Sequence, residues 1–313
     1  MGKKDILEKR LLEKNEVFAD VFNNIVFGGK QVLNSAKLES ISTESYTRKH
    51  NGTWRQGNRD IRKIDRDHQQ YRLICGIENQ ENCDNTMPVR TMGYDYASYE
   101  EQIRELQTKN RAEGNSAYTK GIHDDQKLAP VVTTVLSFGE NWEGPKSLHD
   151  LLDFPEEYRE ELKMLVPDYR LNLIRVEDLS DEVIGRLTSD FRFVAEFCAG
   201  RKKAVKLKAL FAEDTRKIQY PEELLDLLAE VTGDKRFQEI IGSIAKKKGE
   251  EITMCTMVDE LVQSGMEQGI SLGRMEILEL VKKMILNGEG ELVTELSENE
   301  ELLRQMSRKY QSL

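Results

Sequence analysis

Polar side chains of the kinds that bind metal ions and phosphates cluster after one short apolar run of the sequence. The run Leu73-Ile-Cys-Gly-Ile77 is followed by Glu78 and, two residues later, by Gln80. Strand side chains alternate between faces, so a strand here projects Glu78 and Gln80 to one side and Asn79 to the other. Asp60 comes eighteen positions before Glu78. If a hairpin joins them, two carboxylates and an amide share a small volume that suits a divalent metal ion.

The elements that must position these groups are strands. Residues 73–77 are apolar without the polar positions of a helical turn, which predicts a buried strand. The polar segment 65–70 supplies a bend after a first strand at about residues 60–64. The segment Pro130–Phe138 is β-branched and apolar on both faces, as a central strand is. The sequence therefore predicts a sheet with the polar cluster at its rim.

Helices are predicted on both sides of these strands. Apolar residues recur at spacings of three and four over residues 5–27, and Gly28-Gly29 ends the pattern. A second helix is expected from Val89 to Lys109, with Pro88 near its first turn. Residues 30–58 are less regular and indicate a connection. Together these elements predict an α/β fold with a mixed sheet flanked by helices.

The character of the chain changes beyond Ser147. Amphipathic helix patterns occupy residues 148–152, 162–165, 183–197, 224–231, 237–244 and 253–286. We predict a catalytic domain over residues 1–200 and a mainly helical C-terminal region over residues 201–313. Gly265, Gly269 and Gly273 recur every four residues. They indicate either a self-association surface, and hence a homodimer, or simple tolerance of glycine.

Composition narrows the classes of function. The 313 residues are 38% hydrophobic and 33% charged, and no apolar run approaches the ~20 residues that span a bilayer. The charged start does not lead into a signal peptide, so we expect a cytoplasmic protein without a membrane partner. Four scattered cysteines favour no zinc or redox site. A net charge of −10 argues against broad attraction to nucleic acids but leaves room for a local basic face.

Several motifs carry a resemblance to a known family. They are Asn58-Arg-Asp-Ile-Arg62, Gly76-Ile-Glu-Asn-Gln80, Met87-Pro-Val-Arg90 and Tyr94-Asp-Tyr96. In this order they resemble the recombination-promoting nuclease family, also described as transposase-like, within the PD-(D/E)xK nuclease superfamily. Phe18–Asn23 and the Pro130–Gly139 strand fit the same family. The resemblance covers residues 13–200 and implies a restriction-endonuclease-like core.

Chemistry and resemblance together suggest a metal site. Asp60 and Glu78 would bind Mg²⁺, or Mn²⁺ in its place, and the main-chain carbonyl of Asn79 would add a third oxygen. By resemblance, Asp20 on the first helix is an extra acidic group at the metal. Gln80 completes the catalytic set but departs from the lysine usual in the superfamily. A neutral amide can hydrogen-bond a water but cannot stabilise negative charge as an ammonium does.

The helix after Gln80 carries candidate DNA contacts. Arg90 and Arg104 offer planar forks for phosphates, while Tyr94 and Tyr96 offer stacking faces. The alternative is that the tyrosines pack against the sheet. The densest basic run, Gly200–Lys208, would lie along DNA or form a solvated helix end.

These observations favour a Mg²⁺-dependent DNA endonuclease linked to transposition or recombination, with Asp60, Glu78 and Gln80 as catalytic residues. The alternative is a nuclease-like interaction or DNA-binding protein with weak or no catalysis, favoured by the neutral Gln80 and the acidic total charge. A third hypothesis is a hydrolase of small phosphate esters.

Overall fold

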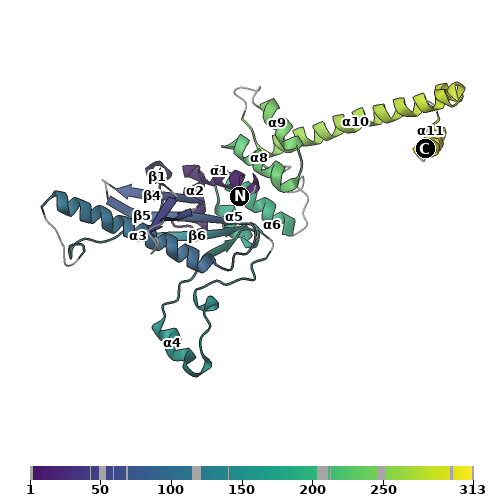
Figure 1. Ribbon diagram of the computed structural model, residues 1–313. Helices are drawn as coiled ribbons and strands as arrows, with labels where there is room; N and C mark the ends of the chain where they lie inside the picture. The colour runs from purple at the N-terminus through teal and green to yellow at the C-terminus, as the bar shows by residue number, and fades with distance from the viewer. Residues whose placement is uncertain are drawn as a thin grey trace.

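The computed structural model describes most of the chain. The residues described are 3–42, 44–48, 54–58, 60–67, 70–114, 121–139, 141–202, 211, 213–244, 251–296 and 299–311. They form a five-stranded mixed sheet with helices on both faces and a long helical extension (Figure 1). Helices predominate overall, and the predicted α/β class is confirmed.

The sheet contains the predicted hairpin and the predicted central strand. Its order is β1 (Leu38–Ser40), β4 (Ile61–Asp67), β5 (Gln70–Gln80), β6 (Val131–Ser137) and β7 (Asn172–Arg175). β4 is antiparallel to both β1 and β5, whereas β5, β6 and β7 run parallel. β5 is therefore the middle strand, and its carboxyl end carries Glu78 and Gln80. The parallel pairing of β5 and β6 requires a crossover, which α3 (Met87–Ala112) supplies.

Alternation along β5 sorts its side chains between two cores. Leu73, Cys75 and Ile77 join the main core on the face of α1 (Lys3–Leu12), α2 (Asn15–Val21) and α6 (Phe191–Lys202). The opposite face packs under α3, where Met87 and Val135 are buried together. Because Glu78 pairs with Val135 in register, its side chain belongs to the α3 face.

The prediction of a single helix over residues 5–27 is wrong, because the structure divides this segment into two helices and a π-helical turn. α1 ends at Leu12, α2 follows, and a π-helical turn runs from Phe22 to Val26 before Gly28 and Gly29, whose φ angles are 63° and 94°. The buried Lys63 donates to the Glu13 carbonyl at 2.7 Å. The break is thus held by a side chain from a distant strand, which helical periodicity does not reveal.

The remaining differences concern short elements. The predicted connection over residues 30–58 contains β1 and a separate hairpin of β2 (Glu44–Arg48) and β3 (Trp54–Asn58). The region predicted to be helical contains β7, and its helices α4 (Arg159–Leu165) and α5 (Asp181–Arg186) are short. Strands of three to five residues give too few alternations for a pattern to register.

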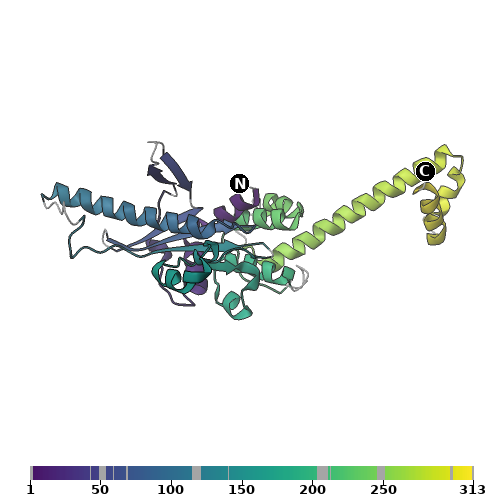
Figure 2. The same ribbon diagram turned by 60° about the horizontal axis from the view of Figure 1, so that its bottom comes forward.

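The C-terminal helices agree with the predictions. They are α8 (Pro221–Thr232), α9 (Arg236–Ile244), α10 (Met254–Leu286) and α11 (Glu300–Gln311). α8 packs against α1, and the main core continues from Leu7 to Leu261, so it crosses the predicted boundary at residue 200. A second small core lies at the far end of α10 (Figure 2). Residues 201–208 of the basic run lie outside the side chains described.

No helix within the described ranges is both long and apolar enough to cross a membrane.

Candidate functional site

The β4–β5 hairpin brings Asp60 to the end of β5. Ile61 lies opposite Ile77, and the same register carries Asp60 to the position facing Glu78. Asp60 Oδ2 accepts a hydrogen bond from the Asn79 N–H at 2.7 Å. The first of the three predicted groups therefore stands beside the strand that carries the other two.

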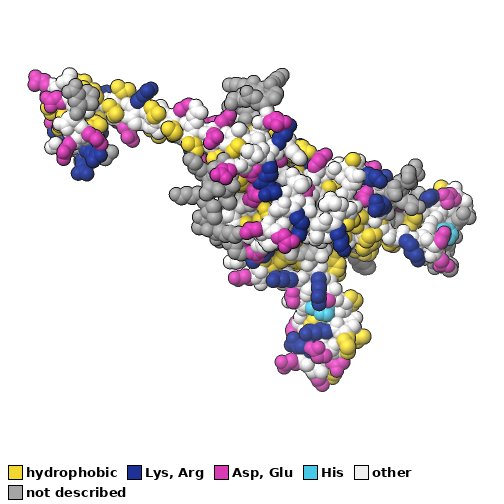
Figure 3. Space-filling model, turned by 180° about the vertical axis from the view of Figure 1, so that it is seen from behind, with side chains coloured by type: hydrophobic (Ala, Val, Ile, Leu, Met, Phe, Trp, Pro, Cys, Tyr) yellow, Lys and Arg dark blue, Asp and Glu magenta, His cyan; other side chains and the backbone are white. Residues whose placement is uncertain are grey.

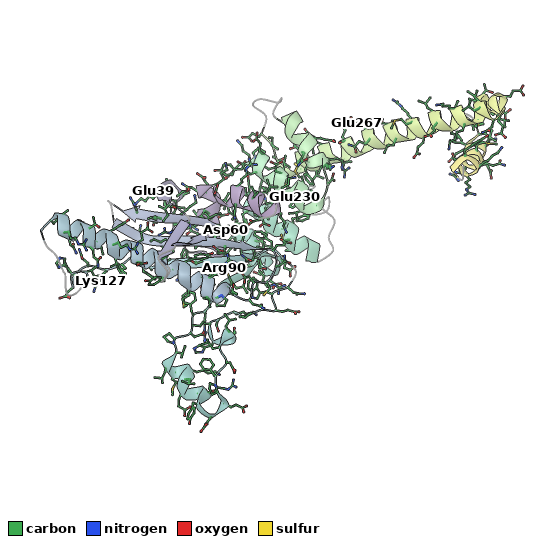
Figure 4. The ribbon with its side chains drawn as sticks, viewed as in Figure 1. Glu39, Asp60, Arg90, Lys127, Glu230 and Glu267 are labelled. Carbon is green, nitrogen blue, oxygen red and sulfur yellow. The ribbon has the colours of Figure 1, made fainter. Side chains whose placement is uncertain are left out.

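Glu78 is fully buried on the α3 face, where it meets a cation. Its Oε2 lies 3.1 Å from the guanidinium of Arg90, which also contacts Asp84 Oδ2 at 2.6 Å and the Tyr94 hydroxyl at 3.2 Å. Burial opposes the charge of Arg90, but hydrogen bonds to Tyr94 and Asp84 and the charge of Glu78 outweigh burial and raise its pKa. Arg90 therefore stays charged beside Glu78. Figure 4 labels Arg90 on α3 and Asp60 at the sheet.

Tyr94 shares this environment. Its side chain is buried, and burial together with the negative charge of Glu78 raises the pKa of its hydroxyl. Tyr94 thus remains a neutral hydroxyl that accepts a hydrogen bond from Arg90. Tyr94 was predicted to offer a stacking face, but it is only 8% exposed and leaves little of its ring open to a base.

The backbone at Asn79 faces Asp60. The N–H and C=O of one strand residue point to the same side, so the Asn79 carbonyl belongs to the Asp60 side of β5. The Asn79 side chain is 5% exposed, and its amide atoms have no hydrogen-bond partner among the described residues. Gln80 is half-buried, and its carbonyl accepts from the Phe138 N–H at 2.9 Å. Alternation turns the Gln80 side chain to the face of Glu78.

Two residues of α1 complete the site, and the sequence argument missed both. Lys9 Nζ lies 2.7 Å from Asp60 Oδ1. Burial opposes the charge of Lys9, but its hydrogen bond and attraction to Asp60 outweigh burial and raise its pKa. A lysine thus stands beside the first carboxylate although none follows Glu78 on the strand.

Glu8 is the second missed residue. It is 3% exposed, and burial raises its pKa to about 8, against the attraction of Lys4 and with help from the charges of Glu81, Asp5 and Asp60. Glu8 therefore holds a proton at neutral pH. A signal was available, because Glu8 falls inside the stripe of apolar residues Leu7, Leu11 and Leu12, where a charged side chain is out of place.

Asp20 lies in a different hydrogen-bond cluster. Its carboxylate accepts from the backbone and hydroxyl groups of Thr188 and Ser189 at 2.7–3.2 Å and from the Asn24 amide at 2.7 Å. None of these partners contacts Asp60 or Glu78 in the described part of the chain. Asp20 fastens α2 to the segment that precedes α6, and its geometry accounts for that role without a metal ion.

Of the residues on α3 that were predicted to contact DNA, some lie at the site and others lie away from it. Arg90 and Tyr94 lie at the site, whereas Tyr96 is 57% exposed away from the sheet. Arg104 pairs with Glu100 at 2.7 Å and follows Arg90 by fourteen residues, about 21 Å at 1.5 Å per residue. Only the first turns of the helix can therefore serve the site directly.

The site contains only a few oxygen atoms that could bind a metal ion in the described part of the chain. Within the described ranges, no three His, Cys, Asp or Glu side chains come close enough together to hold a metal ion. Two carboxylates and a carbonyl remain, which are hard ligands of the kind that Mg²⁺ prefers. The cluster joins acidic groups with Lys9 and Arg90 at the end of a mixed sheet.

No protein-family profile matches the chain, and no curated protein or solved structure shows significant similarity to it. The family suggested by the motifs stays a prediction, and the geometry of the site carries the functional argument.

Proposed function

We propose that the protein is a Mg²⁺-dependent DNA endonuclease with a restriction-endonuclease-like core. One observation carries the proposal: Asp60, immediately before β4, and Glu78, on the adjacent strand β5, flank a backbone group of Asn79 that hydrogen-bonds to Asp60. Phosphodiester hydrolysis needs acidic ligands for a metal and cationic groups for the phosphate, and both kinds meet here. The motifs at residues 58–62 and 76–80 support a link to transposition or recombination.

Asp60, Glu78 and the Asn79 carbonyl would hold the metal ion. When bound, Mg²⁺ lowers the pKa of an attacking water and neutralises charge on the phosphate. Lys9 and Arg90, which neutralise the two carboxylates here, would then donate to the phosphate oxygens.

Lys9 also supplies the positive charge that the neutral side chain of Gln80 lacks. In the superfamily that the motifs resemble, a strand lysine orients the water and stabilises negative charge, which an amide cannot do. The ammonium of Lys9 reaches the same carboxylate cluster from α1, 2.7 Å from Asp60. We assign the cationic role to Lys9 and the water-orienting hydrogen bonds to Gln80.

A plasmid-nicking assay with Mg²⁺ tests the proposal. Asp60→Ala and Glu78→Ala should each lower the rate by at least about 100-fold, because each removes a metal ligand. Lys9→Met should lower it less, and Glu100→Gln, an outward-facing change on α3, should leave it intact. Circular dichroism checks that each variant is folded. Unchanged nicking by folded Asp60→Ala and Glu78→Ala variants would refute the assignment.

The ion pairs at the site also favour one alternative, a nuclease-like protein that binds DNA without cutting it. Both carboxylates already have cationic partners in Lys9 and Arg90, so a metal must compete with them. Titration with Mn²⁺ separates the two functions, since a nuclease site binds the ion and loses it in Glu78→Ala. A hydrolase of small esters would show no salt-dependent affinity for DNA.

A further inference from the structure

α10 leaves an apolar face uncovered between two packed ends. α9 packs near its start, and the second core, with α11, covers Leu280 and Met284 near its end. Between these ends the helix extends away from the other described elements (Figures 1 and 2). Figure 3 shows hydrophobic side chains along this arm. The stripe consists of Val262, Met266, Ile270 and Ile277, which are 37%, 64%, 54% and 46% exposed.

This stripe continues a surface that is already used for packing. At 100° per residue, Val262, Met266, Ile270 and Ile277 share one side of the helix with Leu280 and Met284. The distal part of the side is covered by the chain's own C-terminal helix, and the proximal part is not. Most of the stability of a helix in a protein comes from packing of its apolar face, so covering the exposed part of this stripe would stabilise α10.

The glycines on the same side point to close packing. A Cβ on Gly265 would lie 2.6 Å from the guanidinium of Arg236, so the approach of α9 explains that glycine. A Cβ on Gly269 or Gly273 meets nothing within 4 Å. Glycine weakens a helix interior, and nothing within the described chain requires it at these two positions. The close approach of a backbone from another molecule would require glycine there.

We propose that a second copy of this chain covers the stripe, with the two α10 helices antiparallel about a two-fold axis near residue 270. The pattern is then self-complementary. Met266 and Ile270 of each copy come level with the turns of the other that carry Gly273 and Gly269, so that bulky side chains enter glycine notches. A two-fold contact presents the same surface on both copies, as this single stripe does.

The charges favour the antiparallel direction. Glu267 and Arg274 lie on the same flank of the stripe, seven residues apart, and Arg274 has no ion-pair partner among the described residues. About the proposed axis, Glu267 of one copy is level with Arg274 of the second copy, and the pair occurs twice. In a parallel pair in register, Glu267 of one copy and Arg274 of the other would lie on opposite sides of the seam, so this ion pair could not form.

Sedimentation analysis of the full chain tests the dimer. The wild-type protein should be a dimer, and Ile270→Glu should weaken it by at least about 100-fold, because the charge would enter the seam from both copies. The matched control is Met275→Glu, since Met275 is 57% exposed on the opposite side of α10 and should tolerate the charge. A monomeric wild-type protein, or equal disruption by both variants, would overturn the proposal.

Cysteine cross-linking tests the direction, in a Cys83→Ser, Cys255→Ser background. A mixture of Glu267→Cys and Arg274→Cys chains should form mixed disulfide dimers, whereas neither variant alone should cross-link efficiently. Self-linking of Ile277→Cys, within the stripe, would indicate a parallel pair and overturn the antiparallel arrangement, because the antiparallel pair places the two copies of residue 277 about 21 Å apart. Glu267→Arg should weaken the dimer, and adding Arg274→Glu should restore it; failure of this rescue with an intact fold also counts against the arrangement. Nuclease activity is not needed for any of these readouts.

Discussion

The carboxyl end of β5 and the middle of α10 depart from the usual distribution of side chains in opposite ways. At the sheet end, Glu8 and Glu78 are carboxyl groups with almost no exposure. On α10, Met266 and Ile270 are apolar side chains with more than half of their surface exposed. Buried polar groups and exposed apolar patches are the informative exceptions in a folded protein, whereas a single exposed leucine is not.

The two regions lower the stability of the folded protein in different ways. Burying carboxyl groups lowers stability, and the sheet end compensates with Arg90, Lys9 and a retained proton on Glu8. Exposing apolar surface lowers stability in water, and α10 compensates only if another surface covers it. The first pattern therefore indicates chemistry within the chain, and the second indicates a partner outside it.

The largest expected effect concerns the buried carboxyl groups at the carboxyl end of β5, and it is the pH dependence of stability that arises from Glu8. The pKa of Glu8 is about 8 in the folded protein and 4.5 without perturbation, so the folded state binds the proton more tightly than the unfolded chain. Stability should fall as pH rises from about 5 to about 8, by up to about 1.4 kcal/mol per pH unit. Glu8→Gln should flatten this slope in urea-unfolding curves, because an amide has no proton to lose.

Glu13→Gln is the control for Glu8, since Glu13 is exposed just after the same helix. It should retain the wild-type slope. An equal slope in wild-type protein and Glu8→Gln would mean that Glu8 is already ionised and that the compensation at the sheet end has another source.

Removing Arg90 tests the compensation for Glu78. Arg90→Ala takes away the cation 3.1 Å from a fully buried carboxylate and should cost about 3 kcal/mol of unfolding free energy. Arg104→Ala on the same helix removes an exposed pair with Glu100 and should cost under about 0.5 kcal/mol. Adding Glu78→Gln to Arg90→Ala should recover part of the loss. Equal losses from Arg90→Ala and Arg104→Ala would contradict this reading.

The sequence predicted the part of the site that depends on local pattern. The apolar run before Glu78, the polar bend and the eighteen-residue spacing to Asp60 were sufficient to predict the hairpin that aligns them. The long helices were predictable for the same reason, because α3 and α10 repeat their periodicity over many turns. Strands β1 and β7 were not, since three or four residues carry almost no period.

Contacts between distant segments could not be read from spacing. Lys9 reaches Asp60 only because α1 packs over the sheet end, fifty-one residues away in sequence. Asp20 was expected at the metal by resemblance, but a helix face does not reveal which distant loop will meet it, and that loop holds Thr188 and Ser189. In each case the missing information is the packing of one helix against a distant segment.

The smallest expected effect concerns Gly273 in the exposed middle of α10. It shows whether this glycine is needed for packing between two copies or is merely tolerated. In an Ile270→Glu background that is monomeric, Gly273→Gln should stabilise α10 by about 0.5 kcal/mol, because glutamine is the better helix former and its Cβ meets nothing within 4 Å. Hydrogen exchange of amides 266–278 should slow about twofold. In the otherwise wild-type chain the same substitution should weaken the dimer, because the glutamine would fill the notch opposite Met266 of the second copy. An effect of the same sign in both backgrounds would show that the glycine has no role in packing between copies, and the contrast between the two regions would then rest on the sheet end alone.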